Sequence, residues 1–123
     1  MPFVGLLGTQ VLEANESRVT ARLAWDESRC TTDGAMHGGA LMALADTTGG
    51  ICAFMNLPDG AVGTTTIESK TIFLRGVRAG HVDAISTPLH AGRTTIVVET
   101  DLFDADGRRV AKVLQSQAVL RPS

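Results

Sequence analysis

The sequence predicts an α+β fold in which one long helix packs on a single face of an antiparallel sheet. Residues 37–57 are rich in Ala, Leu and Met and form a stretch that is long enough for a helix rather than a strand. After this stretch the chain is rich in β-branched residues, and short segments of turn-forming residues divide it into strands. Short connections favour antiparallel neighbours, because a parallel pairing requires a crossover of about a dozen residues or more.

A hairpin and a loop are predicted before the helix. Residues 5–13 and 18–25 alternate in character, and the turn between them contains Asn15 and Ser17, which favour that conformation. Residues 26–36 are small and polar and show neither the helical nor the strand period of apolar residues. We therefore expect two paired strands, followed by a loop that leads into the helix.

Four strands are predicted after the helix. The helix is expected to end where Asn, Pro, Asp and Gly gather at residues 56–60. The strands then fall at residues 62–74, 81–89, 94–103 and 109–120. Because their connections are short, we expect these strands to form a meander. No internal repeat or linker interrupts the chain, which predicts a single domain over residues 1–123.

Composition narrows the classes of function. The formal net charge is −2 at pH 7 and acidic and basic residues are mixed, so no basic stripe is available for a nucleic acid. The hydrophobic fraction of 44% is ordinary for a globular protein, and the helix carries Asp46 and several glycines, which disfavours a membrane span. The first residues lack the basic start of an export signal. Cys30 and Cys52 lack metal-ligand spacing and are expected to stay reduced, which favours a cytoplasmic protein.

Asp46 is the only charged side chain between Met36 and Pro58. At about 100° per residue the helix has two apolar stripes and no properly polar face, which predicts that its own sheet and a second subunit enclose it. Burying a carboxylate is costly unless donors surround it or it takes up a proton, so we expect Asp46 to be buried with such partners. It is then a candidate acid, base or nucleophile, or a structural acceptor for a backbone or threonine donor.

His37-Gly38-Gly39 stands where the loop becomes the helix. Glycines let another molecule approach the backbone closely, and the free N–H groups at the start of a helix bind anions. The same groups can stabilise the oxyanion that develops when a carbonyl carbon is attacked. The alternative is that the glycines only form a tight turn. A site for an acyl carbonyl and a carboxylate are thus predicted on one helix, with Asp46 nine positions beyond His37.

The segment from His37 to Asp46, HGGALMALAD, resembles the HGGxxxxLAD pattern of the hotdog thioesterases related to the phenylacetate-pathway enzyme and to 4-hydroxybenzoyl-CoA thioesterase. Two further features are similar to that family's first long strand. Thr66-Ile67-Glu68 runs into Phe73-Leu74-Arg75, and Gly80 follows the next turn. The order of elements is similar over nearly the whole chain.

The resemblance implies a hotdog fold, in which an antiparallel sheet of about five to six strands wraps one long central helix. It also implies a homodimer or homotetramer with active sites at the subunit interface, and an acyl-CoA thioester as substrate. Asp46 would then act as a general base on water or as a nucleophile, and the Gly38 N–H of the other subunit would hold the carbonyl oxygen. Thr66 matches a position that orients water or the carboxylate. His37 would shape the start of the helix.

Two positions depart from the family pattern. Relatives often have Asn six residues before the histidine, where it positions water or the carboxylate, and this chain has Thr31 there. The Pro that commonly follows the Phe-Leu-Arg triplet is Gly76. Threonine is shorter and offers a hydroxyl in place of an amide, so we expect lower activity or the use of another donor.

Substrate contacts are expected at both ends of the thioester. Three arginines at predicted strand ends or turns are candidates for binding the CoA phosphates: Arg75, Arg78 and Arg93. Exposed arginines are more often plain solubilising charges. The candidates for the acyl group share the helix and are Gly39, Met42, Ile51 and Phe54. No metal or other cofactor is expected, and His81 and His90 lack the spacing of a metal site.

Two other functions stay open at this point. One is a non-catalytic module that binds acyl-CoA or fatty-acyl groups, since a fold does not determine its chemistry. Asp46 argues against this function, because a carboxylate is a burden beside a purely apolar ligand. The other is a dehydratase or hydratase, which needs an acid/base pair at the α and β carbons of its substrate. No histidine is a convincing partner of Asp46 for that reaction.

Overall fold

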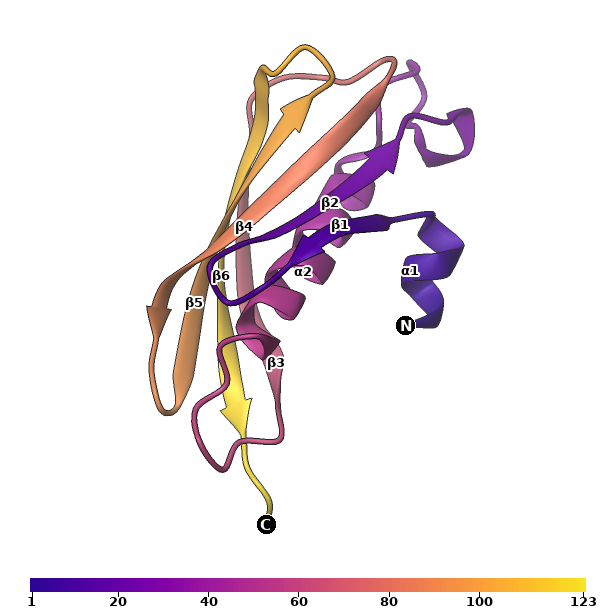
Figure 1. The fold of residues 1–123 in the computed structure, drawn as a ribbon. Coiled ribbons are helices and arrows are strands. Elements are labelled where there is room, and N and C mark those ends of the chain that lie inside the picture. The colour runs from indigo at the N-terminus through magenta and orange to yellow at the C-terminus, as the bar shows by residue number, and fades with distance from the viewer.

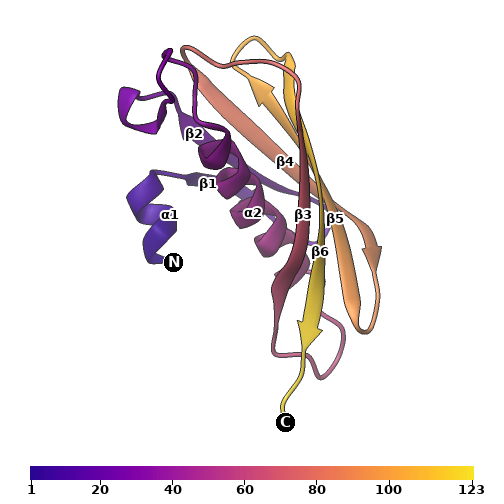
Figure 2. The ribbon, with the colours of Figure 1, turned by 180° about the vertical axis from the view of Figure 1, so that it is seen from behind.

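The computed structural model describes residues 1–123 and shows a six-stranded antiparallel sheet that curves around one long helix (Figures 1 and 2). The helix is α2 (Gly38–Phe54), which lies across one face of the sheet. The strands are β1 (Gln10–Ala14), β2 (Val19–Ala24), β3 (Gly63–Phe73), β4 (His81–Ala91), β5 (Thr95–Asp104) and β6 (Arg109–Leu120). Every pair of neighbouring strands is antiparallel, so the predicted α+β fold is confirmed.

The strand order is β1-β2-β4-β5-β6-β3, so the predicted meander of four strands is wrong for β3. The strands β4, β5 and β6 do form a meander, but β3 pairs with β6 at an edge of the sheet. The seven residues 74–80 between β3 and β4 therefore cross over β6 and β5. Three strand spacings amount to about 14 Å, and an extended chain covers about 3.3 Å per residue, so this connection is long enough.

The first hairpin is present, but it begins later than predicted. Residues 2–7 form a short helix, α1 (Pro2–Leu7), where the sequence was expected to begin a strand at residue 5. Pro2 is suited to the first position of a helix, and Gly8 ends the helix with a left-handed φ of 91°. In the β1–β2 turn, the Asn15 side chain accepts hydrogen bonds from two backbone N–H groups. The predicted loop contains one 3₁₀ turn, η1 (Glu27–Arg29).

The core lies between α2 and the inner face of the sheet. Alternate residues of β2, β4 and β5 are buried, which is the strand period that the sequence predicted. The helix residues that face this core are Leu41, Leu44, Ala45, Thr48, Gly49, Cys52 and Ala53. The opposite side of α2 is open, with Met42 and Phe54 exposed by 40% and 57%. The sheet covers only one of the two apolar stripes of the helix, and the enclosure of the other stripe by a second subunit stays a prediction.

The edge strand β3 is largely exposed along its whole length. Its register with β6 shifts between Thr66 and Glu68, so Ile67 forms a β-bulge and is 62% exposed. Unpaired strand edges of this length commonly take up another strand. None of the helices combines the length and the hydrophobicity that crossing a lipid bilayer requires.

Candidate active site

The carboxylate of Asp46 is anchored to the sheet through one of its two oxygens. The Thr66 hydroxyl on β3 donates a hydrogen bond to Asp46 Oδ1 over 2.9 Å. The Gln115 side-chain amide on β6 donates to the same oxygen over 3.2 Å. No group of the chain donates to Asp46 Oδ2. Asp46 is exposed in the single chain, and its predicted burial, which involves a second subunit, stays a prediction, whereas the predicted donors are present.

A second amide determines the direction of the Thr66 hydrogen bond. Gln117 Nε2 donates to Thr66 Oγ1 over 2.6 Å. Because an amide nitrogen can only donate, Thr66 must use its single proton toward Asp46. The network therefore runs from the Gln117 amide through the Thr66 hydroxyl to Asp46 Oδ1.

Local backbone features bring these side chains together. Thr66 lies opposite Gln117 in the β3–β6 ladder, directly before the bulge at Ile67. Gln115 and Gln117 both lie on the buried side of β6, with 0% and 1% exposure. On α2, a Cβ added at Gly49 would lie 1.9 Å from Gln115 Oε1, so only glycine leaves room for this side chain. The bulge, the period of β6 and the missing Cβ together place two donors at Asp46 Oδ1 and a third polar group, Gln117, beside Thr66.

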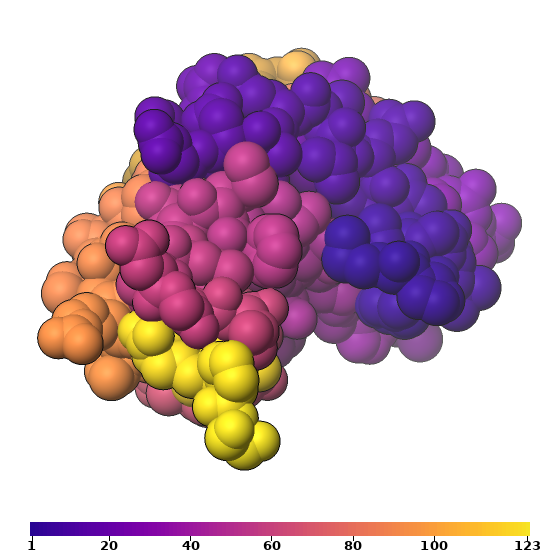
Figure 3. All heavy atoms as spheres, turned by 60° about the horizontal axis from the view of Figure 1, so that its bottom comes forward, coloured from indigo at the N-terminus to yellow at the C-terminus, as the bar shows by residue number.

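Asp46 opens onto a groove of about 620 Å³ between α2 and the start of β3. The residues that line it are Met1, Asp46, Thr47, Gly50, Ile51, Phe54, Gly63, Thr64, Thr65, Thr66 and Gln117. Asp46 is the only ionisable side chain among them. Figure 3 shows the indigo N-terminal residues as a lobe that stands to one side of the magenta residues. Of the residues predicted to contact the acyl group, Ile51 and Phe54 line this groove, but Met42 does not.

The start of α2 carries a free backbone donor. His37 Nδ1 accepts the Gly39 N–H over 2.7 Å and so caps the helix. The Gly38 N–H has no acceptor in the chain. An added Cβ at Gly38 would lie 3.1 Å from the Phe73 ring at the end of β3. Because its Nδ1 accepts a hydrogen bond, the neutral His37 ring carries its proton on Nε2 and has no free basic nitrogen.

One chain does not bring Gly38 and Asp46 together. They are eight positions apart along α2, which corresponds to about 12 Å at 1.5 Å per residue. Gly38 borders a second, smaller hollow with Phe73, Leu74 and Arg75, and Asp46 is absent from its lining. A single carbonyl group cannot contact both residues within one chain.

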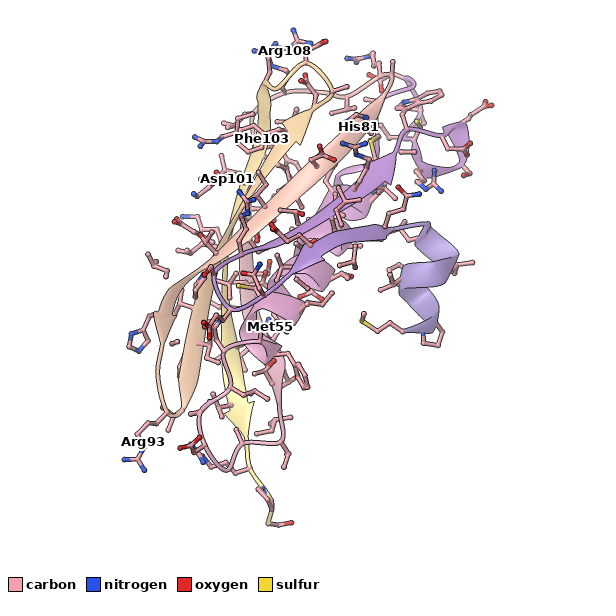
Figure 4. The ribbon with its side chains drawn as sticks, in the orientation of Figure 1. Met55, His81, Arg93, Asp101, Phe103 and Arg108 are labelled. Carbon is pink, nitrogen blue, oxygen red and sulfur yellow. The ribbon has the colours of Figure 1, made fainter.

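The remaining predicted residues are dispersed. Thr31 lies in the loop before α2, where its N–H donates to Ala35 O, and it does not line the Asp46 groove. Gly39 is exposed at the first turn of α2. Among the arginines, Arg78 forms an ion pair with Asp33 at 2.9 Å. Arg93 lies at the β4–β5 turn, at the opposite end of the sheet from Arg108 (Figure 4).

Gln115 and Gln117 were not predicted as site residues from the sequence. Both occupy core-facing positions of β6, in alternation with the buried Val113. Two amides on an otherwise apolar strand face are unusual, because a buried polar group needs a partner. This pattern was a visible signal that β6 contributes polar groups to a site.

A model of the thioesterase superfamily matches residues 33–111, which include Gly38, Asp46 and Thr66. The chain belongs to the thioesterase superfamily. The predicted family resemblance is thereby confirmed, and thioester hydrolysis is supported as the class of reaction of this thioesterase-superfamily protein.

Relatives of this thioesterase-superfamily protein agree with the match. It is 32% identical over 116 residues to the proofreading thioesterase EntH of Cronobacter turicensis, covering 93% of this chain and 82% of the relative. A thioesterase structure from Haemophilus influenzae is similar, with a TM-score of 0.91 at 26% identity. The match covers 97% of this chain and 82% of the Haemophilus influenzae chain. The PaaI protein of E. coli, from the phenylacetic acid degradation operon, has a TM-score of 0.90 at 18% identity, covering 100% and 87%. At that identity the likeness is one of fold, and the predicted hotdog fold is confirmed.

Other reactive side chains of this thioesterase-superfamily protein lie apart from the groove. Burial raises the pKa of the Cys52 thiol to about 11, so the nucleophilic thiolate is scarce at neutral pH. His81 lies 3.6 Å from a carboxylate oxygen of Asp83 on β4. No three side chains of His, Cys, Asp or Glu are grouped closely enough to hold a metal ion.

Proposed function

We propose that this protein hydrolyses an acyl-CoA thioester to the free acid and CoA, with Asp46 as general base or nucleophile. The observation that carries the proposal is the asymmetric hydrogen bonding of Asp46. Oδ1 accepts from Thr66 and Gln115, whereas Oδ2 is free at a groove with no other ionisable side chain. A carboxylate held by one oxygen presents the other in a defined direction, which suits attack on a carbonyl carbon or on the proton of water.

The reaction can be written with the residues of the chain and no cofactor. In the general-base route Asp46 takes a proton from water, and the hydroxide oxygen bonds to the carbonyl carbon. The carbonyl oxygen becomes an oxyanion, which the Gly38 N–H of a second copy stabilises. When the carbon–sulfur bond breaks, Asp46 returns the proton to the sulfur of CoA. In the nucleophilic route Asp46 Oδ2 attacks the carbonyl carbon, the carbon–sulfur bond breaks, and CoA leaves as a thiolate that takes a proton from water. A water molecule then hydrolyses the resulting anhydride, which releases the free acid and regenerates the Asp46 carboxylate.

A second copy is required because Gly38 and Asp46 are about 12 Å apart along one helix. Each of these two residues lies beside a residue of β3: Thr66 contacts Asp46, and Phe73 packs on Gly38. If two copies pair antiparallel along β3 about Ser69, the Phe73 end of one strand lies beside the Thr66 end of the other. This pairing brings the Gly38 N–H of each copy toward the Asp46 of its partner and forms two equivalent sites.

Charges on β3 favour the same register. With Ser69 at the centre, Glu68 lies directly opposite Lys70 of the second copy, and the symmetry repeats the pair. Opposite charges in directly facing positions stabilise antiparallel strands. Ile72 and Phe73 are each 49% exposed, and a second copy would cover them. We propose a homodimer on these grounds, which could associate further into a homotetramer.

The two halves of the substrate would then meet different chains. The acyl group would occupy the groove, where Ile51 and Phe54 offer apolar contact. Arg75 lies beside Gly38 and is the arginine best placed for the CoA portion. Arg78 is engaged with Asp33, and Arg93 lies at the β4–β5 turn, so we assign neither to the substrate. The two free thiols fit the reducing cytoplasm, where we place the protein.

The deciding experiment is CoA release from phenylacetyl-CoA, a hydroxybenzoyl-CoA and medium to long acyl-CoAs, for the parent chain and Asp46→Asn. We expect turnover to fall by about 10²–10⁴-fold in the variant, because its near-isosteric amide cannot act as a base. An Asp46→Asn protein that keeps its thermal stability and its turnover would overturn the proposal. If neither protein releases CoA while both bind acyl-CoA, the chain is a binding module instead.

A further inference from the structure

We propose that Gln115 is a positioning residue, which holds Asp46 Oδ1 so that Oδ2 is the reacting oxygen, and that Gln117 serves the same purpose through Thr66. This inference rests on the proposed function of Asp46. Gln115 contacts the carboxylate but does not line the groove, so its effect on the reaction must pass through Asp46.

The orientation of the Gln115 amide follows from its surroundings. Nε2 lies 3.2 Å from Asp46 Oδ1. With the amide reversed, Gln115 Oε1 would face Asp46 Oδ1 and the hydrogen bond from the Thr66 hydroxyl to Oδ1 would leave two acceptor oxygens against each other. On the other side, Gln115 Oε1 is buried with no hydrogen-bond partner and points at Gly49. The amide therefore offers its donor to Asp46 and leaves its acceptor unsatisfied.

An unsatisfied buried carbonyl oxygen destabilises the folded state. An apolar side chain of the same length would fill the same space beside Gly49 without that cost. Gln115 thus sacrifices stability at a position that contacts the working carboxylate. Trade-offs of this kind are typical of residues that serve function rather than folding.

Because Asp46 Oδ1 already accepts two hydrogen bonds, we infer that Oδ2 is the oxygen that reacts. Two donors, the Thr66 hydroxyl and the Gln115 amide, occupy Oδ1, whereas no group of the chain donates to Oδ2. The Thr66 proton is committed, because Gln117 donates to its oxygen at 2.6 Å. Thr66 is consequently not an acid in the reaction, and Oδ2 alone is free to accept a proton or attack carbon.

The test replaces Gln115 by Met, which keeps the length of the side chain and removes the amide. We expect kcat to fall by about ten- to a hundredfold with KM within about twofold, while Tm rises by about 3 °C. Gln117→Met should lower kcat less, by about three- to tenfold, because it acts through Thr66. Gln10→Met, on the exposed strand β1 at the far edge of the sheet, is the matched control and should change neither activity nor Tm by a comparable amount.

The outcomes separate this inference from the proposed function. If Asp46→Asn abolishes turnover while Gln115→Met and Gln117→Met keep the parent kcat, the positioning role is wrong and the proposed function stands. If Asp46→Asn itself retains turnover, the proposed function fails first. A Gln115→Met protein that loses both kcat and Tm would show that Gln115 is structural, and one that does not fold would show the same. In either case Gln117→Met must still lower kcat at unchanged Tm for its own role to stand.

Discussion

Thr66 on β3 donates a hydrogen bond of 2.9 Å to Asp46 on α2, and this contact joins an edge strand to the helix that carries the carboxylate. The hydroxyl has no freedom to turn away, because Gln117 donates to its oxygen from β6. Three elements thus determine the orientation of one side chain. The contact also ties the site to β3, the strand along which we propose that a second copy binds.

Thr66→Val should lower kcat for thioester hydrolysis by about ten- to a hundredfold. Valine keeps the shape of threonine but removes the donor to Asp46, and a hydrogen bond to a charged group contributes about 1.5–3 kcal/mol. Thr66→Ser keeps the hydroxyl and is the matched control, which should stay within about threefold of the parent. Steady-state rates decide the matter. Equal rates for valine and serine would mean that the hydroxyl has no part in orienting Asp46.

Gly38→Pro should remove the oxyanion donor and leave the helix intact. Proline lacks an N–H and is tolerated at the first position of a helix, and His37 has the extended conformation that precedes proline, with φ of −62° and ψ of 135°. We expect kcat to fall by about 10²–10³-fold, as for the loss of one such donor in other enzymes.

Gly38→Ala is the control for that experiment. It keeps the N–H but adds the Cβ, which would lie 3.1 Å from the Phe73 ring and require a small movement of that ring. Its kcat should exceed that of Gly38→Pro by at least about tenfold. If the two variants lose activity equally, crowding against Phe73 rather than the missing N–H is responsible.

Charge reversal on β3 tests the proposed register between two copies. Either Glu68→Lys or Lys70→Glu alone should weaken the dimer, because like charges then face each other twice across the two-fold axis. The double variant Glu68→Lys/Lys70→Glu restores opposite charges and should restore the dimer and its activity. Light scattering over a range of concentrations gives the mass. A double variant that dissociates as readily as the single ones would exclude pairing centred on Ser69.

The thiols of Cys30 and Cys52 should react slowly with alkylating reagents in the folded protein. Burial raises the pKa of the Cys52 thiol to about 11, and burial also raises the pKa of the Cys30 thiol. At pH 8 both thiols are therefore protonated and react slowly with iodoacetamide. We expect mass spectrometry to find Cys52 unmodified until denaturant is added. Rapid alkylation of Cys52 in the folded protein would show that its surroundings open readily to solvent.

Acid should destabilise the turn between β5 and β6. The backbone N–H of Arg108 donates to Asp104 Oδ1 over 2.9 Å, and this hydrogen bond lowers the pKa of the Asp104 carboxyl. Since the pKa is lower in the folded state, the stabilisation is present above the unfolded value of about 3.9 and is lost as the pH falls below it. Thermal melts of the parent should therefore depend more steeply on pH below about 5 than melts of Asp104→Asn. Asp106→Asn removes the other carboxylate that pairs with Arg108, at 3.2 Å, and is the control for the loss of one negative charge in this turn.

The sequence by itself was sufficient to predict the helix, the turns and the candidate residues Gly38 and Asp46, because these depend on local preferences and on spacing along one helix. The order of strands depended on tertiary structure. Residues 74–80 look like a hairpin turn in sequence but cross over two strands, since a curved sheet brings the ends of β3 and β4 within reach of seven residues. The same placement of β3 leaves it at the edge and leaves one side of α2 open.

The partners of Asp46 were likewise decided only in three dimensions. Gln115 and Gln117 lie 69 and 71 positions after Asp46 in the chain, and they reach the site because β6 pairs with β3 and packs beneath α2. Nothing in the sequence distinguishes Gly49 from an ordinary helix glycine. The structure shows that the Gln115 amide occupies the space that a Cβ at this position would fill. Motifs and turns are properties of neighbouring residues and can be read along the chain. Contacts between distant polar side chains depend on strand pairing and packing, which no local pattern specifies.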